Sequence, residues 1–120
     1  MKTLIKQISL LVLGLIIAFN TLTTNVAAET ITVKMGSDKG ALVFEPKNVI
    51  IQAGDTIKWV NNKAYPHNVI VQGDAELSHK KLLVKPGATV ESTFATSGEY
   101  SYYCTPHRGA GMVGKVTVQG

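Results

Sequence analysis

The residues best suited to binding a metal lie close together near the end of this sequence, in a turn rich in glycine. Cys104 is the only cysteine of the chain, and His107 and Met112 follow it closely. Thiolate, imidazole and thioether groups are all ligands for soft or borderline metals. Each residue alone would have an ordinary explanation in the core or in a loop, since free cysteine and methionine are usually buried. Three ligand types within one short turn favour a metal site instead.

A second histidine, His67, lies between two stretches that we predict to be strands, and it completes a set of four ligands. Loops at one end of a β-sandwich converge even when they are far apart in the sequence. Two imidazoles and a thiolate in a trigonal plane, with a weak axial thioether, form a blue-copper electron-transfer centre. Zinc sites use cysteine and histidine in a closed arrangement and would leave the methionine without a role. We therefore expect one copper ion per chain, bound by His67, Cys104, His107 and Met112.

The turn that carries Cys104 also contains residues that restrict or free its backbone. Pro106 should stiffen the segment between Cys104 and His107. Three glycines follow, and we expect them to allow a tight turn around the metal, either through a positive φ or where a side chain would clash. They are Gly109, Gly111 and Gly114.

Short runs of alternating apolar and polar residues, separated by turn residues, occupy the rest of the chain. This pattern predicts an all-β fold, an antiparallel sandwich or barrel. Residues 74–83 could form a short helical turn, and we predict that His79, within them, is a solvated surface residue. The predicted strands are Thr30–Met35, Val49–Gln52, Thr56–Val60, Asn68–Gln72, Ala88–Phe94, Glu99–Cys104 and Val113–Val118.

The N-terminal stretch has the pattern of a secretory signal peptide. Lys2 and Lys6 give a positive start, the apolar run Leu10–Phe19 follows, and Val26-Ala27-Ala28 offers the small residues that signal peptidase prefers. An uncleaved anchor is the alternative, but the run is only half of the roughly 20 residues that a spanning helix needs. We predict cleavage after Ala28, which leaves residues 29–120 as one domain.

The charge of the predicted domain does not favour nucleic-acid binding. The chain has 12 basic and 8 acidic residues, and two of the lysines lie in the signal peptide. The remaining net charge is small, and no dense stripe of lysine and arginine is present. In an exported protein, a lone cysteine is a liability unless it is buried or ligated. This supports a ligand role for Cys104.

The segments around the four ligands resemble the plastocyanin family of cupredoxins. They are Gly98–His107 (GEYSYYCTPH), Gly109–Val118 (GAGMVGKVTV), Pro66-His67-Asn68 and Gly40–Phe44 (GALVF). The resemblance covers essentially all of residues 29–120. The Cys-x2-His-x4-Met spacing is less specific, because pseudoazurin-like cupredoxins share it. Those proteins usually continue into C-terminal helices, and this sequence ends within one strand of Met112.

The resemblance implies a Greek-key β-sandwich of about eight strands with copper near one end. It implies a monomeric electron carrier, not an enzyme, that works in the thylakoid lumen and is at most peripheral to the membrane. Such a carrier takes an electron from cytochrome f of the cytochrome b6f complex and delivers it to photosystem I. A terminal cytochrome oxidase is a further candidate electron acceptor.

The resemblance also assigns roles around the metal. Asn68 corresponds to the residue that ties the two ligand loops together by hydrogen bonds. His107 is then the electron port, and Tyr103 corresponds to a lateral contact residue. The apolar docking patch around the port corresponds to Leu42, Pro66, Gly109 and Ala110.

The sequence departs from plant members of the family on the side near Tyr103. Plant proteins carry clustered acids there, whereas this chain has Asp74 and Glu76 followed by three lysines, and Arg108 stands directly after His107. The balance, together with a single signal peptide, resembles the cyanobacterial type. We therefore expect docking to depend on the apolar patch and Arg108.

Three other functions are alternatives to a photosynthetic electron carrier. A related periplasmic cupredoxin could donate electrons to a non-photosynthetic redox enzyme. A thiol enzyme would need a group to orient His107, and no carboxylate or amide lies near it in the sequence. A copper store would be expected to have several cysteines or many methionines. The first of these is the main alternative.

Overall fold

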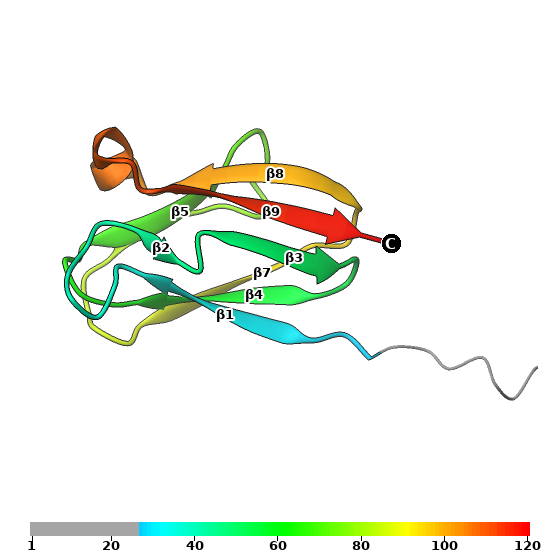
Figure 1. Ribbon diagram of the computed structural model, residues 1–120, viewed down its shortest axis with the longest axis horizontal. Coiled ribbons are helices and arrows are strands. Elements are labelled where there is room, and N and C mark those ends of the chain that lie inside the picture. The colour runs from blue at the N-terminus through cyan, green and yellow to red at the C-terminus, as the bar shows by residue number, and fades with distance from the viewer. Residues whose placement is uncertain (1–26) are drawn as a thin grey trace, which may run out of the picture.

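Two β-sheets packed face to face make up residues 27–120, the part of the chain that the computed structural model describes (Figure 1). Almost all of the predicted signal peptide lies outside these residues. One sheet has the order β2 (Phe44–Glu45), β1 (Thr30–Met35), β4 (Thr56–Asn61), β7 (Thr89–Thr93). The other has the order β3 (Asn48–Gln52), β9 (Val113–Gln119), β8 (Gly98–Tyr103), β5 (His67–Val71), β6 (His79–Leu83). The predicted all-β sandwich is confirmed.

The sheets are mixed, so the prediction of an antiparallel sandwich was wrong for two of the strand pairs. β1 pairs with β4 in parallel, with Val33 opposite Trp59, and β3 pairs with β9 in parallel, with Val49 opposite Val116. The remaining pairs are antiparallel. Alternation of apolar and polar residues reports only which face of a strand is buried. It carries no information about the direction of the neighbouring strand.

Two strands were missed by the sequence pattern. β2 has only two residues, and β6 (HKKLL) has two adjacent lysines in place of alternation. β6 is an edge strand, and its pairing with β5 shifts register between His67 and Val69. Lysines and irregular pairing are common at sheet edges, where they prevent further strands from adding. Residues 79–83 therefore form a strand, and the prediction that a helical turn could include them was wrong.

His79 joins the open edges of the two sheets. Its Nε2 lies 2.7 Å from the carbonyl oxygen of Glu91 and 3.1 Å from Ser92 Oγ, both on β7. A carbonyl oxygen only accepts, so Nε2 carries the proton. The side chain is half-buried rather than solvated. The prediction of a free surface histidine was wrong because β6 was not recognised as a strand beside β7.

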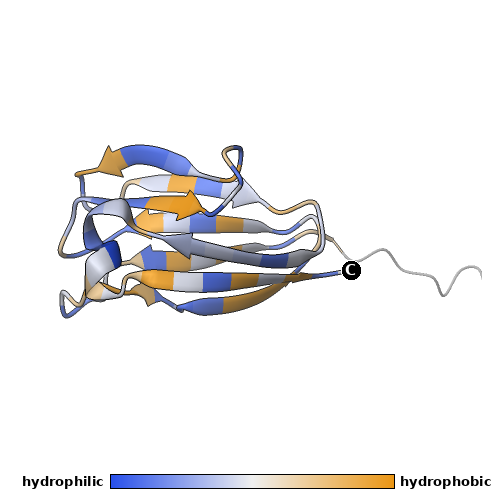
Figure 2. Ribbon diagram, turned by 90° about the horizontal axis from the view of Figure 1, so that it is seen from above, coloured by the Kyte–Doolittle hydropathy of each residue, from blue (hydrophilic) through white to orange (hydrophobic). Residues whose placement is uncertain are grey.

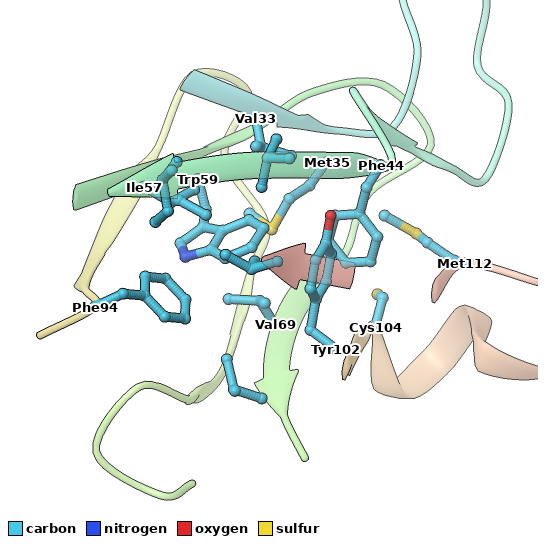
Figure 3. Close-up of a cluster of buried hydrophobic side chains, with 14 of the residues drawn as sticks. Val33, Met35, Phe44, Ile57, Trp59, Val69, Phe94, Tyr102, Cys104 and Met112 are labelled. Atoms are coloured by element: carbon cyan, nitrogen blue, oxygen red, sulfur yellow. The ribbon is translucent and has the colours of Figure 1, made fainter. Parts of the chain in front are cut away.

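The core lies between the sheets and is organised around three aromatic rings. Phe44, Trp59 and Tyr102 meet edge to face, with ring centroids 4.7 to 5.9 Å apart. Hydrophobic and hydrophilic residues alternate along many of the strands (Figure 2), as expected when one face of each strand is buried. Cys104 and Met112 lie together at one side of this cluster (Figure 3). The core thus extends directly to the predicted metal ligands.

The segment between β8 and β9 is a short 3-10 helix, η1 (Thr105–Ala110). Pro106 lies in its first turn, and Gly111 caps its end in the left-handed conformation with φ 92°. η1 lies at the end of the sandwich opposite to the C-terminus (Figure 1). Within residues 27–120, no helix is long and apolar enough to cross a membrane.

Candidate metal centre

The predicted ligands come from two segments that the sandwich brings together at one end. His67 is the first residue of β5, and Cys104 directly follows β8, which pairs with β5. The loop from Cys104 to Met112 closes on itself through backbone hydrogen bonds. The N–H of Cys104 donates to the Met112 carbonyl over 3.1 Å, and the N–H of Met112 donates to the His107 carbonyl over 3.2 Å. These hydrogen bonds tie the two ends of the loop together.

The donor atoms of three predicted ligands face one another. Cys104 Sγ lies 3.7 Å from His67 Nδ1 and 3.6 Å from His107 Nδ1. One ligand atom from each residue lies within 4.8 Å of the other two. His67 and Cys104 are fully buried, whereas His107 is half-buried. The arrangement is a compact three-donor pocket that opens to solvent on one side only through His107.

The orientation of the His67 ring is fixed from the side remote from Cys104. Its Nε2 lies 2.9 Å from the carbonyl oxygen of Lys63. Because a carbonyl oxygen only accepts, Nε2 carries the proton and Nδ1 keeps its lone pair. Metal-binding histidines are commonly held in this way, with the second ring nitrogen donating to a carbonyl. Nδ1 is therefore the nitrogen available for a metal.

Burial sets the protonation of two donors. It lowers the pKa of His67, although the hydrogen bond with the Lys63 carbonyl opposes this, and the neighbouring His107 lowers it slightly further; the shift favours the neutral imidazole. Burial raises the pKa of the Cys104 thiol, although hydrogen bonds from the backbone N–H groups of Asn68 and His107 oppose this. A buried thiolate needs a positive charge beside it. A bound cation would supply that charge and displace the thiol proton.

Met112 is fully buried and lies beside Cys104 at the edge of the core (Figure 3). Its backbone is bonded to Cys104 and His107, as described above. The position is compatible both with packing and with an axial thioether ligand. The ligand role of Met112 stays a prediction.

Asn68 connects the two segments that carry the donors. Its Oδ1 accepts a hydrogen bond from the Thr105 N–H over 2.7 Å, and its Nδ2 donates to Thr105 Oγ1 over 3.0 Å. Nδ2 also donates to the Lys80 carbonyl of β6 over 3.1 Å. All of these groups lie within one residue of a donor or on the adjacent edge strand. The side chain thus links β5 to β6 and to the first residue of η1.

The three glycines that were expected to shape the loop are not alike. Gly111 has the positive φ that the prediction required. Gly109 has neither a positive φ nor any atom near a Cβ. A Cβ on Gly114 would overlap the Tyr102 ring and the Lys47 carbonyl oxygen, which are parts of the fold and not of the metal pocket. Only Gly111 therefore shapes the loop in the predicted manner.

The residues predicted to form the docking surface differ in their exposure. Gly109 and Ala110 are exposed, while Leu42 and Pro66 are half-buried. Arg108 is exposed and its guanidinium carbon lies 4.0 Å from the centroid of the Tyr103 ring. A cation over an aromatic face is an attractive arrangement. This contact joins the residue beside the predicted port to the predicted lateral residue.

A shallow groove of about 450 Å³ runs beside Tyr103 and was not foreseen from the sequence. Pro106, Leu82 and Lys80 line it together with Tyr103. The groove exists because β6 pairs with β5 and brings Lys80 and Leu82 next to η1. Recognition of β6 as a strand would have been needed to find it.

The donor set fits a copper ion. It offers a neutral imidazole, a second imidazole and a thiol on converging vectors, with a thioether close by. Nitrogen and soft sulfur donors together suit both oxidation states of copper.

The comparisons with known proteins agree with this donor set. The model of the copper binding proteins, plastocyanin/azurin family, matches residues 31–119. A plastocyanin of Synechococcus sp. (strain JA-2-3B'a(2-13)) is 56% identical, over 94% of this chain and 89% of that protein. A chloroplastic plastocyanin of Tetradesmus obliquus is 50% identical, over 78% of this chain and 70% of that protein.

Solved structures of copper proteins share the fold. The oxidised form of plastocyanin from Dryopteris crassirhizoma superimposes with a TM-score of 0.66 at 26% identity, over 74% of this chain and 100% of that chain. Amicyanin from Paracoccus versutus superimposes with a TM-score of 0.60 at 30% identity, over 79% of this chain and 86% of that chain.

Proposed function

The chain belongs to the plastocyanin/azurin family of copper-binding proteins, and we propose that it is a mobile carrier in photosynthetic electron transport. Its class is that of type 1 copper electron-transfer proteins, not of enzymes. The proposed ligands are Nδ1 of His67, Sγ of Cys104, Nδ1 of His107 and the thioether of Met112. Copper bound there supplies a one-electron Cu+/Cu2+ couple. The observation that carries the proposal is the convergence of three donor atoms within 4.8 Å.

The protein itself fixes the positions of the donor side chains and shields them from water. His67 is fixed by Lys63, and the loop from Cys104 to Met112 is closed by its own hydrogen bonds. Donors held by packing and by outer hydrogen bonds move little when the charge on their ligand changes. A small rearrangement lowers the barrier to electron transfer. Burial of Cys104 keeps water away from the sulfur.

We assign the electron port to the exposed edge of His107. It is the least buried of the four proposed ligands, so a partner can approach it most closely. The proposed docking patch consists of Leu42, Pro66, Gly109 and Ala110, with Arg108 and Tyr103 at its side. A flat apolar surface allows brief contact without a strong bond, which suits a carrier that must leave its partner.

The proposed partners are cytochrome f of the cytochrome b6f complex as donor and photosystem I as acceptor. The names of the relatives, one of them a chloroplastic plastocyanin, support this assignment. The proposed location is the thylakoid lumen, which the chain reaches as residues 29–120 after cleavage at Ala28, as a monomer. Arg108 and Lys80, which both lie beside Tyr103, give this face a positive charge, which would steer encounter with acidic partner surfaces.

A copper titration tests the metal centre. Addition of Cu(II) to the metal-free protein should give an intense blue charge-transfer band, which ascorbate bleaches and an oxidant restores. Cys104→Ser should remove the band, while His79→Gln, outside the donor set, should keep it. A colourless copper complex with a thiol that still titrates would end this proposal.

Kinetics with isolated partners test the place of the carrier. Flash-induced electron transfer to photosystem I should be fast, and Arg108→Glu should slow the reactions with both partners. Fast reduction of a terminal oxidase would add that partner. If photosystem I accepts no electrons while a non-photosynthetic redox enzyme does, the protein is the related cupredoxin considered above. Unchanged rates for Arg108→Glu would remove that residue from docking.

A further inference from the structure

Gly36, the residue directly after β1, lies buried against the loop that precedes His67. Its backbone has φ +92°, and its N–H donates to the Val43 carbonyl over 2.8 Å. It is far from the donors in sequence and belongs to none of the motifs around them. Its position raises the question of what a side chain there would disturb.

A side chain at position 36 would clash with the hydrogen bond that orients the His67 ring. A Cβ would overlap the Lys63 carbonyl oxygen and would reach within 2.8 Å of His67 Nε2. These two atoms are the partners of the 2.9 Å hydrogen bond that orients the ring. The space left by the missing side chain is therefore the space in which this bond forms.

We propose that Gly36 is a positioning residue of the metal centre, which lets the Lys63 carbonyl close on His67 Nε2 and so aims Nδ1 at the donor pocket. Where the inference concerns copper, it rests on the proposed function. Where it concerns the ring and its hydrogen bond, it stands on the protein alone.

Two further contacts hold the Lys63 carbonyl in place. The Asn62 N–H donates to the Met35 carbonyl over 3.0 Å, and Asn62 Nδ2 donates to the Gly36 carbonyl over 3.0 Å. Ala64 has φ 61°, a left-handed conformation that non-glycine residues seldom adopt. Strained backbone of this kind persists only where its surroundings fix it. Residues 62–64 thus form a strap that crosses Gly36 and ends at the His67 ring.

The chain provides a matched control for the effect of backbone strain. Gly40 has φ +86°, close to that of Gly36, but a Cβ there would meet no atom within 4 Å. Alanine at either position must adopt an unfavourable φ. Only alanine at position 36 would also displace the Lys63 carbonyl and crowd His67. The difference between Gly36→Ala and Gly40→Ala therefore isolates the positioning role.

The test compares these two variants with the unmodified protein, first without metal. NMR of the His67 ring should show a slowly exchanging Nε2–H in the unmodified protein and in Gly40→Ala, and its loss in Gly36→Ala. Copper titration should then show affinity about 10- to 100-fold lower for Gly36→Ala, the range typical when an outer partner of a ligand is lost. An Nε2–H and a copper affinity equal to those of Gly40→Ala would overturn the proposal.

Asn62→Ala covers the case in which Gly36→Ala does not fold. It removes the bonds from the strap to the Gly36 carbonyl and to Asp38 without inserting atoms, so it should speed exchange of the His67 Nε2–H and weaken copper binding. Exchange and affinity unchanged from the unmodified protein would overturn the proposal as well. If the unmodified protein binds no copper, the proposed function fails, but the Nε2–H still reports whether the strap orients the ring.

Discussion

Asn68 and Thr105 are joined by a reciprocal pair of hydrogen bonds. Asn68 Oδ1 accepts from the Thr105 N–H over 2.7 Å, and Asn68 Nδ2 donates to Thr105 Oγ1 over 3.0 Å. One residue follows His67 and the other follows Cys104. The pair therefore fixes the separation of two proposed ligands that are 37 positions apart in the chain.

Removal of this pair should loosen the metal centre. Asn68→Ala leaves the Thr105 N–H without its partner, so we expect a loss of about 1–3 kcal/mol in the free energy of unfolding. Copper affinity should fall by roughly 10- to 100-fold. Chemical denaturation and copper titration measure the two effects. Thr105→Val keeps the bond from the N–H and should have a smaller effect on both, and equal effects would contradict the reciprocal role.

The thioether can be tested without loss of the blue band. Met112→Leu preserves volume in a fully buried position, so the cost in stability should be below about 1.5 kcal/mol. Leucine offers no sulfur, so Cu(II) is stabilised less and the reduction potential should rise. Cyclic voltammetry and visible absorption check both statements. An unchanged potential would show that Met112 has only a packing role, and a lower potential would contradict the axial-ligand argument.

The contact between Gly114 and Tyr102 should be sensitive to one methyl group. A Cβ at position 114 would overlap the Tyr102 ring and the Lys47 carbonyl oxygen, which accepts a hydrogen bond from the Tyr102 hydroxyl. Gly114→Ala should destabilise the protein by about 1–3 kcal/mol, as overpacked cores do. Gly109→Ala, where a Cβ meets open space, is the control and should cost little. Thermal unfolding of the two variants gives the comparison.

Ionisation of Asp55 should make the stability of the folded protein depend on pH in the acidic range. Hydrogen bonds from the backbone N–H groups of Glu29 and Gln52 lower the pKa of this carboxyl below its ordinary value of 3.8. A carboxyl with a lowered pKa in the folded state stabilises the protein above the unfolded value and ceases to do so as the pH falls through the folded value. The stability gap between the native protein and Asp55→Asn should therefore be full near neutral pH and should close below about pH 4. A gap that does not change with pH would contradict this.

Cleavage at the predicted site would have a consequence at the same carboxylate. The N–H of Glu29 lies 2.9 Å from Asp55 Oδ1. Cleavage after Ala28 would turn this N–H into an α-ammonium group beside the carboxylate. A chain that begins at Glu29 should then unfold at a higher temperature than the same chain with an acetylated N-terminus, and Asp55→Asn should abolish the difference. Sequencing of the exported protein's N-terminus would show directly whether Glu29 comes first.

The sequence by itself determined the fold class, and it pointed to the three side chains that meet at the candidate metal centre, His67, Cys104 and His107. Alternation along β1, β4 and β9 reveals buried faces, because side chains of a strand point to opposite sides in turn. Cysteine, histidine and methionine on one short turn are informative since their chemistry does not depend on the fold. The location of His67 could be inferred because loops at one end of a sandwich converge.

Tertiary structure alone decided how these parts are held. Parallel pairing of β1 with β4, and the strand β6, arise from contacts between distant segments that no local pattern records. The hydrogen bond from His67 to Lys63 depends on empty space at Gly36, and a glycine in a sequence does not reveal which atoms approach it. The orientation of a ligand is set by its neighbours in space, and for His67 these include Lys63 in the preceding loop and Gly36 directly after β1.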